Sequence, residues 1–143
     1  MNIEKIIAVS GKPGLYEILS AGKKNIIVRS ISDDKRFPIP AFSNISSLDS
    51  IAIFTNLGEV PLTEVLYKIY QKESGKTGIS HKESATKLTA YFAEILPDYD
   101  TERVYVSNIK KVVQWYNILV ENAFDFEQIN PENTKDEAST GEE

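Results

Sequence analysis

The spacing of apolar residues changes near residue 57, and this change constrains the fold more than any other feature of the sequence. Before it, short β-prone runs such as residues 25–31 alternate their side chains between two faces, and turns rich in glycine or polar residues separate them. After it, apolar residues recur every three or four positions, which is typical of amphipathic helices. The chain is therefore predicted to be α+β, with strands first and helices second.

Five short strands are predicted in the first part of the chain, at residues 5–10, 15–20, 25–31, 37–42 and 50–55. Pro13 and Gly14 suit the two central positions of a type II turn between the first two strands. Pro38 and Pro40 each lack a backbone N–H, which favours an edge or bulged position for the fourth strand. Because closing such a sheet removes its exposed edges, we expect a small five-stranded antiparallel β-barrel over residues 1–57.

Three helices are predicted over residues 58–126, which we expect to form a helical domain. The second helix is expected to begin at a capping box formed by Ser80 and Glu83, and the third is expected to begin at Ser107. The remaining residues 127–143 are mostly polar and acidic, so we predict a disordered acidic tail.

Two segments of the sequence resemble a known family. EKIIAVSGKPGLYEIL (residues 4–19) and RVYVSNIKKVVQWYN (residues 103–117) resemble small uncharacterised Bacteroidetes proteins that carry paired domains of unknown function. The resemblance covers about residues 1–125. It implies an SH3-like barrel followed by a helical domain in a bacterial cytoplasm, and it implies no known activity.

Composition excludes several classes of function. The chain has no cysteine, which rules out disulfides, thiolate zinc sites and cysteine nucleophiles. No apolar stretch approaches the roughly 20 residues of a membrane span, so we expect a cytoplasmic protein without membrane contact. Residues 1–55 hold seven basic and five acidic residues, and the remainder holds nine basic and sixteen acidic residues. This small basic excess is weak support for a nucleic-acid partner.

An acidic stretch between the second and third predicted helices imitates a calcium loop. Asp98, Asp100 and Glu102 have the spacing of the first three ligands. The positions that require glycine and a bidentate glutamate hold Arg103 and Ile109. We therefore interpret the stretch as a connection between helices and predict no metal site.

No catalytic set is recognisable in the sequence. His81 is the only histidine, and no nucleophile or orienting acid lies near it in sequence. The chain also lacks a G-x-S-x-G motif and a phosphate-binding loop. We predict no catalytic residue and no cofactor. An enzyme whose carboxylates meet His81 only after folding remains an alternative, with Asp98, Asp100 or Glu102 among them.

Aromatic and basic residues supply the candidate binding surface. The candidates for contact with a partner are Tyr16, Arg29, Lys35, Arg36 and Trp115. Small barrels bind peptides through aromatic grooves and nucleic acids through stacking and charge. The simpler interpretation is that the neighbouring aromatics Phe37 and Phe42 are core residues and the basic residues decorate turns. Trp115 either widens the helical core or anchors a partner.

The sequence thus favours a non-catalytic binding or assembly module that acts through protein–protein contacts. Its partner is an unknown protein, and homo-oligomerisation is compatible with this function. One alternative is a weak nucleic-acid or polyanion binder that uses the barrel. The other is an enzyme with a carboxylate site that is not recognisable from sequence.

Overall fold

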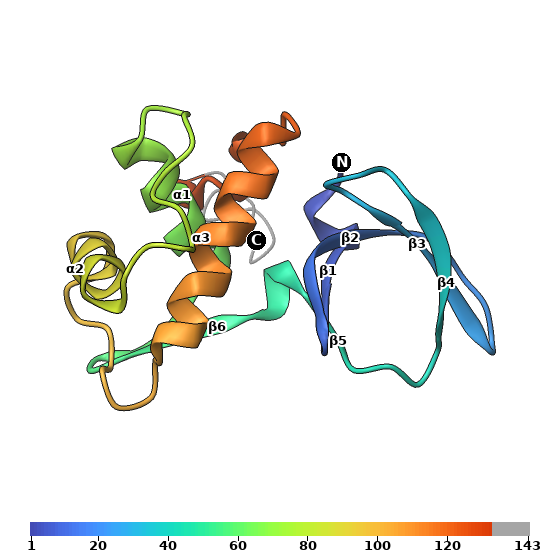
Figure 1. The fold of residues 1–143 in the computed structure, drawn as a ribbon, viewed down its shortest axis with the longest axis horizontal. Coiled ribbons are helices and arrows are strands. Elements are labelled where there is room, and N and C mark those ends of the chain that lie inside the picture. Colours follow the sequence, from blue (N-terminus) through green and yellow to red (C-terminus); the bar gives the residue numbers. More distant parts are fainter. Residues whose placement is uncertain (133–143) are drawn as a thin grey trace, which may run out of the picture.

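The computed structural model describes residues 1–132 and places a β-sheet at one end of the molecule and a helical part at the other (Figure 1). The predicted α+β class and the three α-helices are confirmed. Residues 133–143 of the predicted tail lie outside the described residues. Residues 127–129 were predicted to be disordered, but they belong to a short helix, η3 (Phe126–Ile129), because Phe126 and Ile129 are buried.

The N-terminal sheet has five antiparallel strands in the order β4-β3-β2-β1-β5. Its elements are η1 (Ile3–Lys5), β1 (Ile6–Val9), β2 (Lys12–Ala21), β3 (Asn25–Ser30), β4 (Arg36–Pro40) and β5 (Ile45–Ser47). The two outer strands, β4 and β5, are edges, so the sheet is open. The prediction of a closed barrel is therefore wrong, and the SH3-like description is not confirmed. The two prolines do lie in an edge strand, as expected.

A second, two-stranded sheet explains why the barrel does not form as predicted. The segment expected to be the fifth strand of the barrel forms β6 (Ala52–Thr55), which pairs with β7 (Gly58–Pro61). Only two residues connect these strands, so the hairpin closes locally. The place beside β1 is taken by β5 instead.

The connection between β1 and β2 also differs from the prediction. The turn falls at Ser10 and Gly11, and Gly11 has a φ of 84°. Pro13 and Gly14 lie inside β2, where the register with β1 shifts and forms a bulge. Gly14 has a φ of 87°, which glycine adopts readily. A Cβ at Gly14 would lie 3.9 Å from Ile118 Cδ1, so this bulge approaches the third helix.

The helical part begins directly after β7. Its helices are α1 (Leu62–Lys72), α2 (Ala85–Ile95) and α3 (Val106–Glu121), and a short helix, η2 (Leu48–Ser50), precedes β6. The α2 helix is capped by Ser84, whose side chain accepts from Lys87 N, so the predicted cap at Ser80 is wrong. Before α3, Asn108 Oδ1 accepts from Tyr105 N at 2.9 Å. Within residues 1–132, no helix combines the length and apolar character that crossing a membrane requires.

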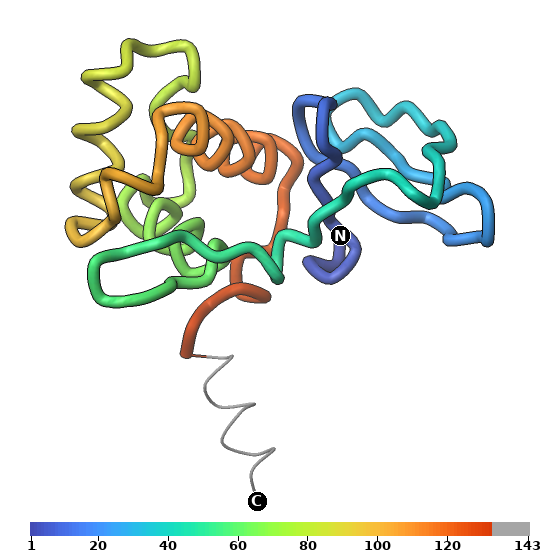
Figure 2. Tube along the Cα trace, turned by 90° about the horizontal axis from the view of Figure 1, so that it is seen from below, coloured from blue at the N-terminus to red at the C-terminus, as the bar shows by residue number. Residues whose placement is uncertain are grey.

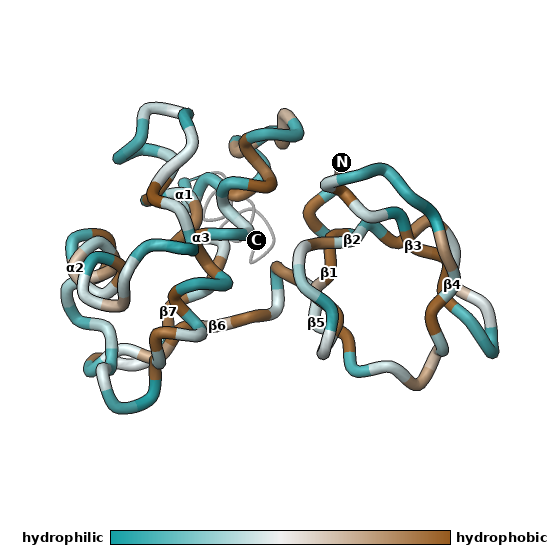
Figure 3. The backbone as a smooth tube through the Cα atoms, in the orientation of Figure 1, coloured by the Kyte–Doolittle hydropathy of each residue, from teal (hydrophilic) through white to brown (hydrophobic). Residues whose placement is uncertain are grey.

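One hydrophobic core joins the sheet to the helices. The sheet contributes Ile6 and Leu15 to it, the turn after β3 contributes Ile31, η2 contributes Leu48, and the helices contribute Phe92, Tyr116 and Leu119, among others. A smaller cluster on the sheet contains Ile7, Val9, Tyr16, Ile26, Val28 and Ile39. Figure 3 shows hydrophobic residues along β1, β6 and much of α3. Figure 2 shows α3 beside the β1–β2 hairpin, so the two halves meet along this helix.

The long connection between α1 and α2 is held by polar contacts to α3. Asn117 Oδ1 accepts from Gly78 N at 2.8 Å, and Asn117 Nδ2 donates to Ile79 O at 3.0 Å. Tyr116 donates its hydroxyl proton to Lys76 O, and burial raises the pKa of Tyr116 to about 12. These contacts fix one side of α3 and leave its other side facing the sheet.

Candidate functional site

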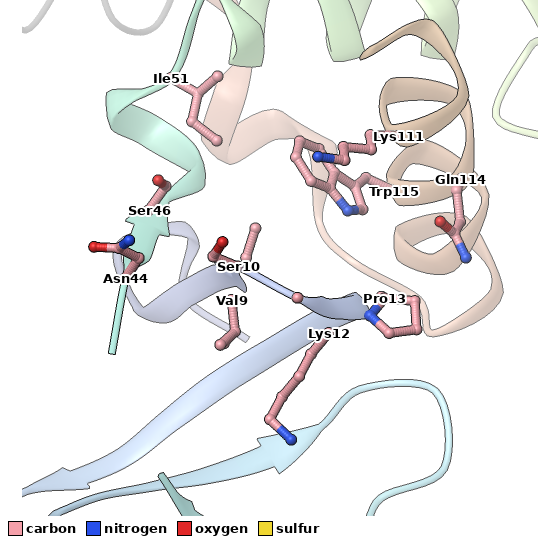
Figure 4. Close-up of a pocket in the computed structure, with 13 residues that line it drawn as sticks. Val9, Ser10, Lys12, Pro13, Asn44, Ser46, Ile51, Lys111, Gln114 and Trp115 are labelled. Carbon is pink, nitrogen blue, oxygen red and sulfur yellow. The ribbon is translucent and has the colours of Figure 1, made fainter. Parts of the chain in front are cut away.

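A groove of about 610 Å³ lies where the sheet meets α3 (Figure 4). One wall comes from the β1–β2 hairpin and β5, and the other comes from α3. Its apolar lining includes Val9, Pro13, Ile51 and Trp115, and its neutral polar lining includes Ser10, Asn44, Ser46 and Gln114. The groove therefore combines apolar contact area with hydrogen-bonding side chains from segments far apart in the sequence.

A smaller cavity of about 150 Å³ continues from this groove between β6 and the first turns of α3. The two cavities share Ile51, Lys111 and Trp115. We call the two together the junction groove. Its lining runs from the turn after β1 to Phe54 on β6.

Trp115 belongs to both the core and the junction groove. The residue is 9% exposed and packs in the shared hydrophobic core. Its ring also lines both cavities, and Figure 4 shows it on the α3 wall beside Lys111. The core interpretation of this residue is thus supported by its burial. Because it is the only tryptophan in the chain, its fluorescence reports on the groove.

The ionisable side chains that line the junction groove are all basic: Lys12, Arg103 and Lys111. Lys12 turns away, and its Nζ lies 5.4 Å from the centroid of the Phe37 ring. Arg103 is paired with Asp100 at 3.1 Å. Lys111 forms no ion pair with any residue in 1–132. Its ammonium is therefore the charge in the groove most available to a ligand.

Two of the residues predicted to contact a partner are engaged within the sheet. Tyr16 is buried, its hydroxyl donates to Pro13 O at 3.0 Å, and burial raises the pKa of Tyr16. Arg29 pairs with Glu17 at 2.8 Å and with Asp34 at 2.9 Å. The hydrogen bond to Glu17 is the main reason that the pKa of Arg29 is raised. These side chains stabilise the sheet.

The other predicted residues lie apart. Lys35 and Arg36 are exposed at the edge formed by β4, and neither lines the junction groove that contains Trp115. Phe42 was interpreted as a core residue but is 88% exposed, because it lies in the turn between β4 and β5. The structure does not bring the five predicted residues together into one surface.

The acidic stretch forms backbone contacts to β6. Asn56 N donates to Asp98 O at 2.8 Å, and Asp100 N donates to Phe54 O at 3.0 Å. The side chain of Asp100 accepts from Glu102 N at 2.9 Å. No group of three potential metal ligands is found in the described part of the chain. The stretch therefore ties the loop before α3 to the second sheet.

His81 lies in a separate polar cavity of about 410 Å³, lined also by Ser80, Lys82, Asn117 and Glu121. None of the three acids of the acidic stretch lines this cavity. His81 precedes α2 and is not its first residue, because the helix begins at Ala85. Among residues 1–132, the structure thus does not bring Asp98, Asp100 or Glu102 into the cavity of His81.

Comparison with known proteins places the chain in a family. A domain of unknown function, DUF5606, matches residues 3–48, and a second one, DUF6852, matches residues 51–119. A solution NMR structure of a Bacteroides vulgatus protein from a structural genomics consortium is 45% identical, covering 86% of this chain and 89% of that chain, with a TM-score of 0.72. The chain belongs to this Bacteroidetes family. No curated protein matches it.

The two matched regions of the family chain meet at the junction groove. Ser10, Asn44 and Ser46 come from the DUF5606 region, whereas Lys111 and Trp115 come from the DUF6852 region. Neither region alone builds both walls of the larger cavity, whereas the smaller cavity is lined only by residues of the DUF6852 region. Sequence reasoning missed the groove because its polar residues are scattered. The one feature of the sequence that pointed to the groove was Trp115, at the edge of the apolar stripe of α3.

Proposed function

We propose that this protein is a non-catalytic binding module that holds a segment of a partner protein in the junction groove. The observation that carries this proposal is that the walls of the groove come from the two different family domains. A site of this kind exists only when the domains are paired and packed on each other. It gives a physical reason for their pairing in one chain.

The lining suits binding better than catalysis. General acid–base chemistry relies on groups such as histidine or carboxylates that gain and lose protons near neutral pH. The ionisable residues that line the junction groove are lysines and an arginine, and the other polar residues are hydroxyls and amides. Hydroxyls and amides both donate and accept hydrogen bonds, and an indole offers a large rigid contact area. These are the groups that a peptide-binding groove needs.

The polyanion alternative has weaker support. It depends on basic residues of the sheet, and Arg29 is already neutralised by two acids. The other six basic residues of this half (residues 1–55) are exposed, but its five acids leave an excess of only two positive charges, which gives a small electrostatic contribution. Binding of this kind would be abolished by nuclease treatment or by moderate salt.

Reversing the charge of Lys111 is expected to weaken capture of the partner. The experiment compares wild type, Lys111→Glu and Lys110→Glu as baits in cytoplasmic extract of the natural host, with nuclease added. Lys110 is the matched control, because it is also exposed on α3 but lines neither cavity of the groove. We expect Lys111→Glu to reduce recovery of the same protein about tenfold, or ~1.4 kcal/mol, and Lys110→Glu to leave it unchanged.

Three outcomes of this capture experiment would count against the proposal. Equal recovery by the two variants would place the partner elsewhere on the surface. Loss of the captured material on nuclease treatment would favour the polyanion alternative. Recovery of only the protein itself, insensitive to Lys111→Glu, would favour homo-oligomerisation through another face.

A further inference from the structure

We propose that the partner segment is acidic and extended, and that it binds by joining the free edge of β6 as an additional strand. This inference rests on the proposed function and specifies the chemistry of the ligand. Three features of the junction groove support it: unpaired backbone groups on β6, a third strand that ends early, and a lining whose charges are all positive.

The backbone of β6 presents hydrogen-bonding groups to the groove. Leu62 N donates to Ile51 O at 2.8 Å. This bond shows that the backbone groups of Ile51, and of every second residue after it, point toward β7. Phe54 O accepts from Asp100 N on the opposite side. Because backbone groups alternate along a strand, the N–H of Phe54 and both backbone groups of Ala52 also point away from β7. Ala52 and Phe54 line the smaller cavity of the groove.

A third strand begins beside β6 but does not continue. Tyr99 forms an isolated antiparallel bridge with Thr55, and the chain then turns back, with Val104 N donating to Asp100 O at 2.9 Å. From outside the hairpin, no segment of residues 1–132 bonds to the N–H of Phe54 or to the backbone of Ala52. An added peptide would lie beside β6 at the position from which the chain turns away after Asp100. Strand addition to an exposed sheet edge is a known mode of peptide recognition.

The charge of the groove selects the kind of peptide. The whole chain has a net charge of −5, yet no Asp or Glu lines the junction groove. In an extended peptide, alternate side chains point to the same side. Acidic residues at every second position would therefore face Lys111 together. The intervening apolar residues would point to the opposite side, toward the ring of Phe54, which is 37% exposed.

The chain's own C-terminal residues are a poorer match for this site than a partner segment. Residues 133–143 read NTKDEASTGEE, which is acidic but contains no apolar residue larger than alanine. Such a sequence offers carboxylates to Lys111 but no large apolar side chain to the ring of Phe54. An acidic segment with alternating apolar residues, supplied by another protein, satisfies both features.

The test uses a synthetic peptide as the probe. The full chain, labelled with ¹⁵N, is titrated with acetyl-(Glu-Val)₃-amide and, separately, with acetyl-(Lys-Val)₃-amide. We expect the acidic peptide to shift the emission of Trp115 and the amide signals of Ala52 and Phe54. At saturation, hydrogen exchange of the Phe54 and Ala52 amides is expected to slow about tenfold, because both become hydrogen-bonded. Lys111→Glu should weaken binding about tenfold, and Lys110→Glu should not.

The results that would overturn the inference are equally specific. They are equal binding of the two peptides, binding without protection of the Ala52 and Phe54 amides, or no binding of the acidic peptide at millimolar concentration. If the acidic peptide fails while capture of a partner still depends on Lys111, the chemistry proposed here is wrong and the binding function stands. If capture does not depend on Lys111, the proposed function itself fails.

Discussion

Replacing Phe126 by alanine is expected to lower the free energy of unfolding by about 3–5 kcal/mol, the usual cost of removing a buried phenylalanine. Phe126 is 3% exposed and stacks on Tyr70 with ring centroids 4.4 Å apart. Its ring also meets those of Tyr116 at 5.6 Å and Phe124 at 5.1 Å. Urea denaturation followed by Trp115 fluorescence measures the change. The substitution should leave a cavity at the centre of this aromatic cluster.

Phe42→Ala is the matched control for Phe126→Ala. It removes the same atoms from a side chain that is 88% exposed, so we expect a change within about 0.5 kcal/mol. Phe126 lies beyond residue 119, where the DUF6852 match ends. Similar stability of the two variants would mean that the segment after α3 is not part of the core.

Leu15→Ala is expected to cost about 2–5 kcal/mol and to destabilise both halves of the molecule together. Leu15 is on β2, is 1% exposed, and belongs to the core cluster that contains Tyr116 and Leu119 of α3. Unfolding is measured by Trp115 fluorescence, which reports on α3, and by NMR signals from β3. Because the core is shared, the two transitions should coincide in the wild type and in the variant.

Leu19→Ala provides the control on the same strand. Leu19 is 39% exposed, so this variant should lose much less stability than Leu15→Ala. A sheet that unfolds at lower urea concentration than α3 would contradict the shared core. The junction groove would then have a movable wall instead of a fixed one.

Local patterns predicted most of the secondary structure but not the pairing of its strands. Residues 52–55 carry the same β-prone pattern whichever sheet they join, so the sequence could not show that they pair with β7. The strand β5 has three residues, one of them apolar, and gives no detectable alternation. The capping pattern at Ser80 and Glu83 was misleading, because Ser84 supplies the actual cap. Each error arose where tertiary contacts decide between local possibilities.

The candidate site was less predictable than the fold. Of the five residues predicted to contact a partner, Trp115 alone lines the junction groove. Arg29 looked available because the sequence does not reveal its ion pairs with Glu17 and Asp34. Lys111 on α3 and Ser46 on β5 line the same groove, and they come together only when the sheet packs against the helices. Such a site has no contiguous motif, so only the three-dimensional structure can identify it.

The most direct test of the central claim is site-specific photo-crosslinking from inside the groove. A benzophenone amino acid is placed at Gln114, which lines the groove, or at Lys110, which does not. Both positions lie on α3, one turn apart on the helix surface, so the two proteins differ mainly in whether the probe lines the groove. We predict a strong crosslink to the partner protein from position 114 and a weak one from position 110. A crosslink from position 110 alone, or none from 114 while the partner still co-purifies, would contradict binding in the junction groove.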